Sequence, residues 1–322
     1  MKLFPLHLIP NDTNIDFMRH SRPVLAFMAI LLVASIAVIG LKGFNYALEF
    51  TGGTMVRTHF AQPVHVDHVR EQLAKAGFSN AEVQSVGGGN DVIVRLQPDN
   101  EHNNAADAGQ QVAERVRAAV STAANPATAQ PGEFVGPQVG RDLAMNGVYA
   151  TLFMLVGFLF YIAFRFELKF AIVASITAFF DLILTVAYMS LLGREFDLTV
   201  LAGMLSVMGF AINDIIVVFD RVRENFRSMR AEPIEILNKS INQTLSRTII
   251  TAVMFFLSAL ALFMYGGESM QGLAETHMIG AIIVVVSSIV VAVPMLAVAP
   301  FKVSKQDLLP KAKDEAALAR RP

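Results

Sequence analysis

The sequence predicts a membrane bundle of six transmembrane helices that carries one ferredoxin-like α+β domain on the periplasmic side. Of its 322 residues, 54% are hydrophobic and 16% are charged, whereas about 25% of the residues of an average soluble domain are charged. The mean hydropathy of +0.49 agrees with this composition. Only one long stretch, residues 42–141, has the mixed polar and apolar pattern of a soluble domain.

Six apolar runs are each about as long as the 20 residues that cross a bilayer. They cover residues 24–41, 143–164, 170–192, 198–219, 248–265 and 278–301. The terminal segments are then residues 1–23 and 302–322. The membrane part after the soluble domain comprises residues 142–301, and it includes a cytoplasmic loop at 220–247. The first run is longer than the apolar core of a signal peptide and is expected to remain as an anchor.

The orientation follows from the Lys and Arg residues beside the spans, which concentrate on the cytoplasmic side. Both tails and the loops after the second and fourth spans hold nearly all of them, and the opposite short loops hold only Arg194. We therefore expect both termini in the cytoplasm and residues 42–141 in the periplasm.

The soluble segment shows the order β-α-β-β-α-β, which is typical of the ferredoxin-like fold. The expected elements are strand 54–60, helix 66–76, strands 81–86 and 92–97, helix 105–124 and a last strand at 133–139. Gly77 is placed to cap the first helix. The middle strands are joined by Gly87-Gly88-Gly89-Asn90-Asp91, whose residues readily adopt the positive φ angles of a hairpin.

Asp214 is a carboxylate inside the fourth apolar run. Such a residue costs roughly 2.5 to 3.5 kcal/mol on insertion scales, so it usually faces the interior of a bundle and has a partner. Gly203, Ser206 and Gly209, followed by Asn213, mark a small-residue face on which helices can approach closely. Asp214 is expected near this face, either as part of an ion pathway or as a polar contact that only holds helices together.

Arg247 is the natural partner of Asp214, because both lie near the same membrane face and arginine can extend inward. Asp214 is about 10 Å from that face at 1.5 Å per residue. Arg247 could equally be an ordinary interfacial arginine. Asp181, about 18 Å beyond Lys169, lies near the midplane. Two carboxylates and a guanidinium are suitable parts for a proton path.

Other kinds of chemistry find little support in the sequence. The absence of cysteine excludes disulfides and thiolate sites. The net charge of −1 and the lack of a basic face give no indication of nucleic-acid binding. His59, His65 and His68 are expected on the surface rather than around a metal. With no nucleotide-binding loop and no hydrolase motif, we expect no cofactor, no metal and no enzymatic activity.

Four stretches in order resemble the SecF family, the smaller subunits of the SecDF component of bacterial protein export. They are GLKGFNYALEFTGGTMV (Gly40–Val56), VGPQVGRDL (Val135–Leu143), INDIIVVFDRVREN (Ile212–Asn225) and LSRTIITA (Leu245–Ala252). The resemblance extends from the first span through the sixth. The chain departs from the family pattern at Glu49, where an aspartate is expected, and at Phe180, where a histidine is expected. The second departure leaves the role of Asp181 open.

The resemblance implies an inner-membrane partner of SecD that uses the proton-motive force to promote export of unfolded preproteins through SecYEG, with YajC and YidC as further partners. It further implies a relation to the resistance-nodulation-division transporters, whose twelve-helix plan is twice the six spans of this chain. It also implies that Asp214 and Arg247 are essential for proton passage. From their positions in the spans, we expect Asp181 and Asn213 to contribute to the same proton path. The resemblance also implies that the membrane helices are surrounded by lipid.

We expect protonation of Asp214 to weaken its attraction to Arg247 and to let the fourth and fifth helices repack. A hinge at Gly52-Gly53 and at Gly136-Pro137 would then allow the soluble domain to move. Two other functions stay open: a passive assembly subunit, and a small-molecule efflux transporter of the related superfamily. The sequence does not distinguish protons from sodium ions.

Overall fold

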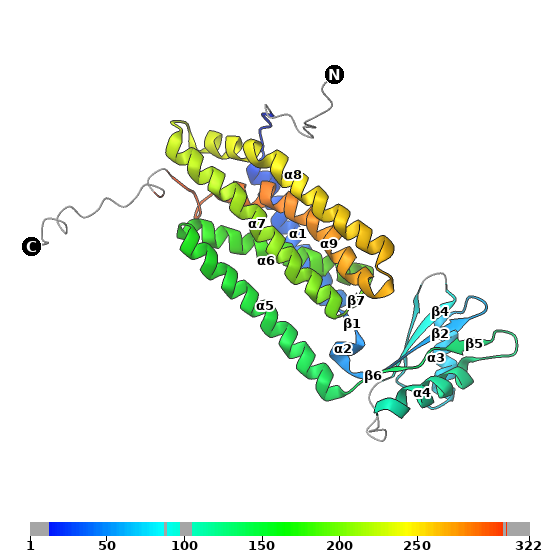
Figure 1. Ribbon diagram of the computed structural model, residues 1–322. Coiled ribbons are helices and arrows are strands. Elements are labelled where there is room, and N and C mark those ends of the chain that lie inside the picture. Colours follow the sequence, from blue (N-terminus) through cyan, green and yellow to red (C-terminus); the bar gives the residue numbers. More distant parts are fainter. Residues whose placement is uncertain (1–12, 87–88, 97–104, 305–306, 308–322) are drawn as a thin grey trace, which may run out of the picture. The chain divides into compact units, whose positions relative to one another are not determined.

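The computed structural model describes residues 13–86, 89–96, 105–304 and Asp307, and it divides into two compact units (Figure 1). The first unit comprises Met1–Asn45 and Thr151–Pro322, and the second comprises Tyr46–Ala150. The chain passes from one unit to the other within the short strand β1 (Asn45–Tyr46) and within helix α5 (Pro137–Arg165).

The first unit is helical, and the described residues contain six helices long and apolar enough to cross a membrane. These are α1 (Ser21–Lys42), α5, α6 (Leu168–Leu192), α7 (Leu198–Ser228), α8 (Pro233–Tyr265) and a sixth that begins as α9 (Glu268–Ser287). The sixth continues through a π-helical turn η1 (Ser288–Ala292) into α10 (Val293–Met295), and β7 (Glu195–Phe196) precedes α7. About half of the residues in the most apolar segment of α6, of α7 and of the sixth helix are buried, so these three helices form the interior of the bundle.

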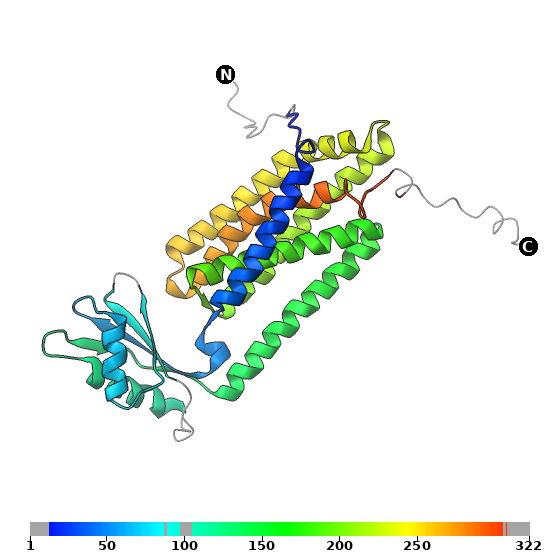
Figure 2. The ribbon, with the colours of Figure 1, turned by 180° about the vertical axis from the view of Figure 1, so that it is seen from behind.

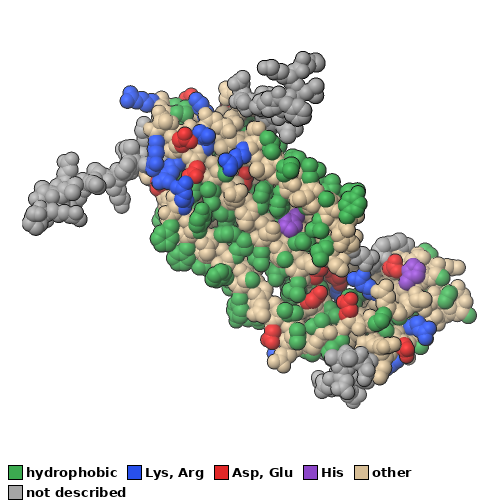
Figure 3. Space-filling model, viewed as in Figure 1, with side chains coloured by type: hydrophobic (Ala, Val, Ile, Leu, Met, Phe, Trp, Pro, Cys, Tyr) green, Lys and Arg blue, Asp and Glu red, His purple; other side chains and the backbone are tan. Residues whose placement is uncertain are grey.

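Helices α1, α5 and α8 bury only a small part of their apolar segments, and many of their apolar side chains are exposed. Figure 2 shows α1 crossing the back of the bundle, where it packs on α6. Lys and Arg side chains gather at the end where α5 meets α6 and α7 meets α8 (Figure 3), and they include Arg165, Arg221 and Arg223. We call this end the basic end of the bundle.

Local chemistry explains where the helices begin and end. Asp197 caps α7, since its side chain accepts a hydrogen bond from the backbone N–H of Val200 at 2.7 Å. Pro233 starts α8 at a position where its missing N–H costs nothing. Gly193 ends α6 with a φ of +64°, in the left-handed region that glycine adopts readily. At the basic end, the rings of Phe170 and Phe219 meet edge to face at 5.1 Å.

The helices differ from the expected spans mainly at their ends. Most of residues 220–247, expected as a loop, is helical, because α7 continues to Ser228 and α8 already begins at Pro233. The expected span 143–164 is part of a longer helix, and the one at 278–301 begins ten residues earlier, at Glu268, and ends at Met295. A count of apolar residues marks the part of a helix within the hydrocarbon, whereas backbone hydrogen bonding continues beyond it.

The second unit consists of one sheet with two helices beside each other on it. Its elements are α2 (Leu48–Thr51), β2 (Gly53–Phe60), α3 (Val66–Lys75), β3 (Glu82–Val86), β4 (Asp91–Leu96), α4 (Ala105–Val120), β5 (Ala127–Ala129) and β6 (Glu133–Val135). The strand order is β3-β4-β2-β5, with β6 also paired to β2, and the pairs are antiparallel. Apolar residues of β2, β3 and β4 meet Val69 and Leu73 of α3 and Val116 of α4 in one core.

The end of this unit differs from the sequence prediction. The last strand, expected at 133–139, stops at Val135 because Pro137 begins α5. Strand β5 was missed, since its three residues, Ala127–Ala129, lack an alternating β-branched pattern. Helix 105–124 ends at Val120. Of the expected hairpin glycines, Gly87 and Gly88 lie outside the described residues.

Candidate functional site

Asp214 lies in the interior of the bundle, on α7, with 4% of its surface exposed. Its Oδ1 accepts a hydrogen bond of 2.8 Å from the hydroxyl of Thr248 on α8. Within the described part of the chain, its Oδ2 has no hydrogen-bond partner. The carboxylate is therefore held at one oxygen and open at the other.

Asp181 is buried more deeply, on α6, with 1% of its surface exposed. Neither of its side-chain oxygens has a hydrogen-bond partner among the described residues. The carboxylates of Asp181 and Asp214 are near enough for their charges to interact. An unpartnered polar group of this kind costs stability, so it usually has a function or a further partner.

The sixth membrane helix lies beside both carboxylates at the point where it changes from an α-helix to a π-helical turn. The Ser287 hydroxyl lies beside Asp181 and the Ser288 hydroxyl beside Asp214. Each serine donates its own hydrogen bond to a backbone carbonyl of the preceding turn. The π-helical turn begins at Ser288, and such turns occur frequently at functional sites. Sequence reasoning did not identify these serines or Thr248, because hydroxyls in membrane helices commonly serve packing alone.

Two of the predicted residues are placed differently from the carboxylates. Arg247 precedes Thr248 on α8, and its side chain is exposed. No ion pair joins Arg247 to Asp214 in the described structure, although the two charges are near enough to attract each other. Asn213 precedes Asp214 and is exposed. Asp214 and Asp181 thus come together in the interior, while Arg247 and Asn213 border the bundle surface.

Small residues bring α7 and α9 close together next to this site. A Cβ atom on Gly203 would lie 2.9 Å from Thr276 Cβ, and one on Gly280 would lie 2.5 Å from Val207 Cγ2. At Gly203, the small-residue face predicted on α7 therefore packs closely against α9. Gly209 has only the end of Met154 nearby, at 3.9 Å.

We expect Gly280→Ala to destabilise the bundle, because its methyl group would overlap Val207 and push α7 from α9. Overpacking of this kind costs about 1–3 kcal/mol. The measurement is thermal unfolding of the purified protein in detergent. Gly157→Ala is the matched control, since a Cβ there meets nothing within 4 Å. Equal melting temperatures for both variants would show that the two helices can separate at little cost.

Two further ionisable groups lie on α9, before the expected start of the sixth span. Glu275 is buried and forms an ion pair with Arg194, the single cation of the opposite short loops. His277 is bound through Nδ1 to the Leu273 carbonyl and through Nε2 to the Ser206 hydroxyl, both at 2.8 Å. They were missed because the sixth span was predicted to begin at Met278, after both residues.

The glycines predicted as a hinge lie together in the second unit. Gly52 has a φ of +68°, and a Cβ on it would lie 2.9 Å from the Cα of Pro137. Gly53 pairs with Val135, the neighbour of Gly136, at one end of the sheet. The four residues thus form one close contact between two segments; their movement stays a prediction.

The six apolar helices, with two buried carboxylates in the bundle interior, make this chain a multi-pass membrane protein. Residues 115–301 match the family described as protein export membrane protein SecD/SecF, C-terminal, and residues 37–64 match the SecD/SecF GG motif. The chain belongs to the SecF family of protein translocase subunits.

Its relatives match along most of their length. The protein translocase subunit SecF of Escherichia coli O157:H7 is 40% identical over 278 residues, which are 86% of this chain and 85% of that protein. SecF of Pseudomonas aeruginosa is 40% identical over 303 residues, 94% of this chain and 96% of that protein. SecF of Calditerrivibrio nitroreducens is 36% identical over 292 residues, 89% of this chain and 94% of that protein.

Solved structures show the same similarity at the level of the fold. The crystal structure of SecDF from Thermus thermophilus, described as a translocon-associated membrane protein, superposes with a TM-score of 0.79 and 33% identity. The match covers 90% of this chain and 39% of that longer chain. A SecDF structure in the super-membrane-facing form matches with a TM-score of 0.65 and 34% identity, over 91% of this chain and 39% of that chain.

Proposed function

We propose that this chain is a non-enzymatic translocase subunit that acts with SecD and uses the proton-motive force to promote preprotein export through SecYEG. The observation that carries the proposal is the pair of buried carboxylates, Asp181 and Asp214, with three side-chain oxygens that lack partners among the described residues. A structural contact alone would not need such a costly arrangement, whereas proton transfer requires oxygens that can be protonated.

The charges around Asp214 support a coupling role. Its proton is proposed to bind at the open Oδ2, while Thr248 holds Oδ1. The exposed Arg247 guanidinium would stabilise the ionised form and lose that attraction on protonation. One charge that moves through 100 mV releases about 2.3 kcal/mol, enough to shift a two-state equilibrium more than tenfold.

The second unit is proposed to be a ferredoxin-like periplasmic domain that handles the preprotein. Its order of elements and the strand order β3-β4-β2-β5 support this fold. Changes in the bundle would reach it through the segments around Gly52-Gly53 and Gly136-Pro137. The Lys and Arg distribution supports cytoplasmic termini. The inner-membrane location is proposed from membership of the SecF family. YajC and YidC remain proposed further partners.

We expect Thr248→Val to reduce export driven by the proton gradient, since valine keeps the shape of threonine but leaves Asp214 Oδ1 unpaired. A hydrogen bond to a charged group contributes about 1.5–3 kcal/mol, so the reduction should be roughly tenfold or more. The measurement is preprotein uptake into inverted membrane vesicles that contain the complex, with and without a proton gradient.

Thr251→Val provides the matched control on the same helix. Among the described residues, the Thr251 hydroxyl donates only to the backbone carbonyls of Arg247 and Thr248. Its loss should leave export near the unmodified level, and Thr248→Ser should retain most of the activity. If Thr248→Val exports normally while the complex assembles, the passive assembly function gains support over the proposed one.

A further inference from the structure

We infer that a groove between α1, α6 and the end of the last helix binds an acyl chain of an anionic phospholipid, with its phosphate group at the basic end of the bundle. The groove has a volume of about 290 Å³. By comparison, a cavity of roughly 150 Å³ in another protein holds one benzene molecule.

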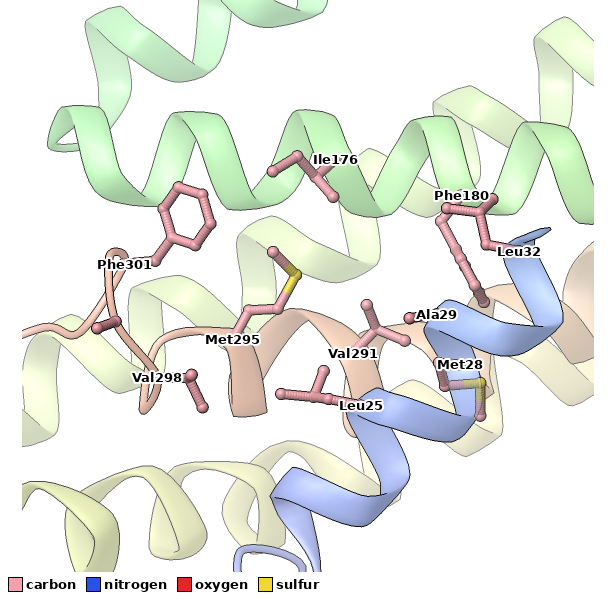
Figure 4. A pocket seen from close by; sticks show the side chains of 11 residues that line it. Leu25, Met28, Ala29, Leu32, Ile176, Phe180, Val291, Met295, Val298 and Phe301 are labelled. Atoms are coloured by element: carbon pink, nitrogen blue, oxygen red, sulfur yellow. The ribbon is translucent and has the colours of Figure 1, made fainter.

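The burial of its lining gives the groove a floor and a rim. Phe180 and Val291 form the floor and are buried, while Ala29, Ile176 and Ala299 form the rim and are exposed. Figure 4 shows the side chains of all three elements around one space, with Phe301 towards one end. The space therefore opens on the outer surface of the bundle, where α1 faces the lipid.

The lining is almost entirely hydrocarbon. Its side chains are those of Leu, Met, Ala, Ile, Phe and Val. Such a surface gains from contact with methylene groups and offers a polar headgroup nothing inside the groove. The occupant must therefore be a narrow apolar chain whose polar part remains outside.

Two cations lie at the basic end of the groove. Arg22 is three residues before Leu25 and so lies above it on the same face of α1. Lys302 follows Phe301 directly. Both side chains are exposed, and no hydrogen bond or ion pair to a described residue engages either one. This places positive charge where the phosphate of a lipid in the groove would lie.

A third cation fixes the segment that bears Lys302. The Lys169 ammonium donates to the Lys302 carbonyl at 2.9 Å and pairs with Asp307, also at 2.9 Å. Lys169 is thereby occupied, while the Lys302 ammonium is available for a phosphate. A helix of a partner protein fits less well, since a helix is about 10 Å across and the groove holds about 290 Å³.

The absence of tryptophan from the chain allows a direct test. Met28→Trp places a single tryptophan in the groove, and Phe27→Trp places one beside it on the exposed, lipid-facing side of α1. The full chain is reconstituted in phosphatidylcholine vesicles. Tryptophan fluorescence is then quenched with brominated phosphatidylglycerol or brominated phosphatidylcholine.

We expect Met28→Trp to show a preference for the anionic lipid of about fivefold per cation and Phe27→Trp to show none. Combining Met28→Trp with Arg22→Gln and Lys302→Gln should abolish the preference. Equal quenching by the two lipids at Met28→Trp would overturn the inference, because the groove would then hold bulk lipid only. Absence of quenching by either lipid would overturn it too.

A second measurement uses the complex with its partner subunit. Native mass spectrometry should detect an anionic phospholipid retained after detergent extraction. Ala29→Phe fills the groove and should lose it, while Ala34→Phe, on the opposite face of α1, should keep it. Equal retention by the two variants would place the retained lipid elsewhere and overturn the assignment.

Discussion

Replacing Asp214 by asparagine should abolish the part of export that depends on the proton gradient, a reduction on the order of tenfold or more. Asparagine has nearly the shape of aspartate, and its side-chain oxygen can still accept the hydrogen bond from Thr248. The change therefore removes the ability to bind and release a proton while the packing stays. Preprotein uptake into inverted vesicles, measured with and without a proton gradient, gives the result.

Asp220→Asn is the matched control for this prediction. Asp220 lies on the same helix, is half exposed and pairs with Arg165 at 3.0 Å. Surface pairs of this kind contribute about 0–1 kcal/mol, so export should change little. If Asp214→Asn leaves gradient-dependent export intact in an assembled complex, Asp214 is a structural contact and the proton pathway lies elsewhere.

The candidate site could be predicted in part from the sequence. A carboxylate in an apolar helix is costly wherever the helix packs, so the interior positions of Asp214 and Asp181 follow from composition alone. The partner of Asp214 could not be predicted in the same way. Residue spacing gives depth along a helix but not its rotation towards its neighbours, and here that rotation directs Thr248, rather than Arg247, to the carboxylate.

The same limit applies to the fold. Long apolar runs identify membrane helices reliably, because about 20 residues must cross the hydrocarbon. They do not show where α9 begins, since Glu275 and His277 are polar residues whose partners, Arg194 and Ser206, come from distant positions. The π-helical turn at Ser288 also leaves no sequence pattern. These missed features depend on tertiary contacts, which local propensity does not encode.

Asp181→Leu should stabilise the protein and, at the same time, abolish gradient-dependent export. Leucine has the same branch at Cγ, although its methyl groups are larger than carboxylate oxygens, and it removes two buried oxygens that have no partners among the described residues. The nearby Ser287 keeps its hydrogen bond to the Val284 carbonyl. Relief of an unsatisfied buried group is worth about 1–3 kcal/mol, which corresponds to a rise in Tm of a few degrees.

The two measurements together separate a role in ion transfer from a role in packing. Thermal unfolding in detergent gives the change in Tm, and vesicle uptake gives the change in export. Asp220→Leu is the control for stability, because it replaces a half-exposed, paired carboxylate and should not raise the Tm. Higher stability with normal export would exclude Asp181 from the proton path. Unchanged stability would mean that the carboxylate has a compensating partner. Higher stability together with loss of gradient-dependent export is the result expected if Asp181 is retained for proton transfer at a cost in stability.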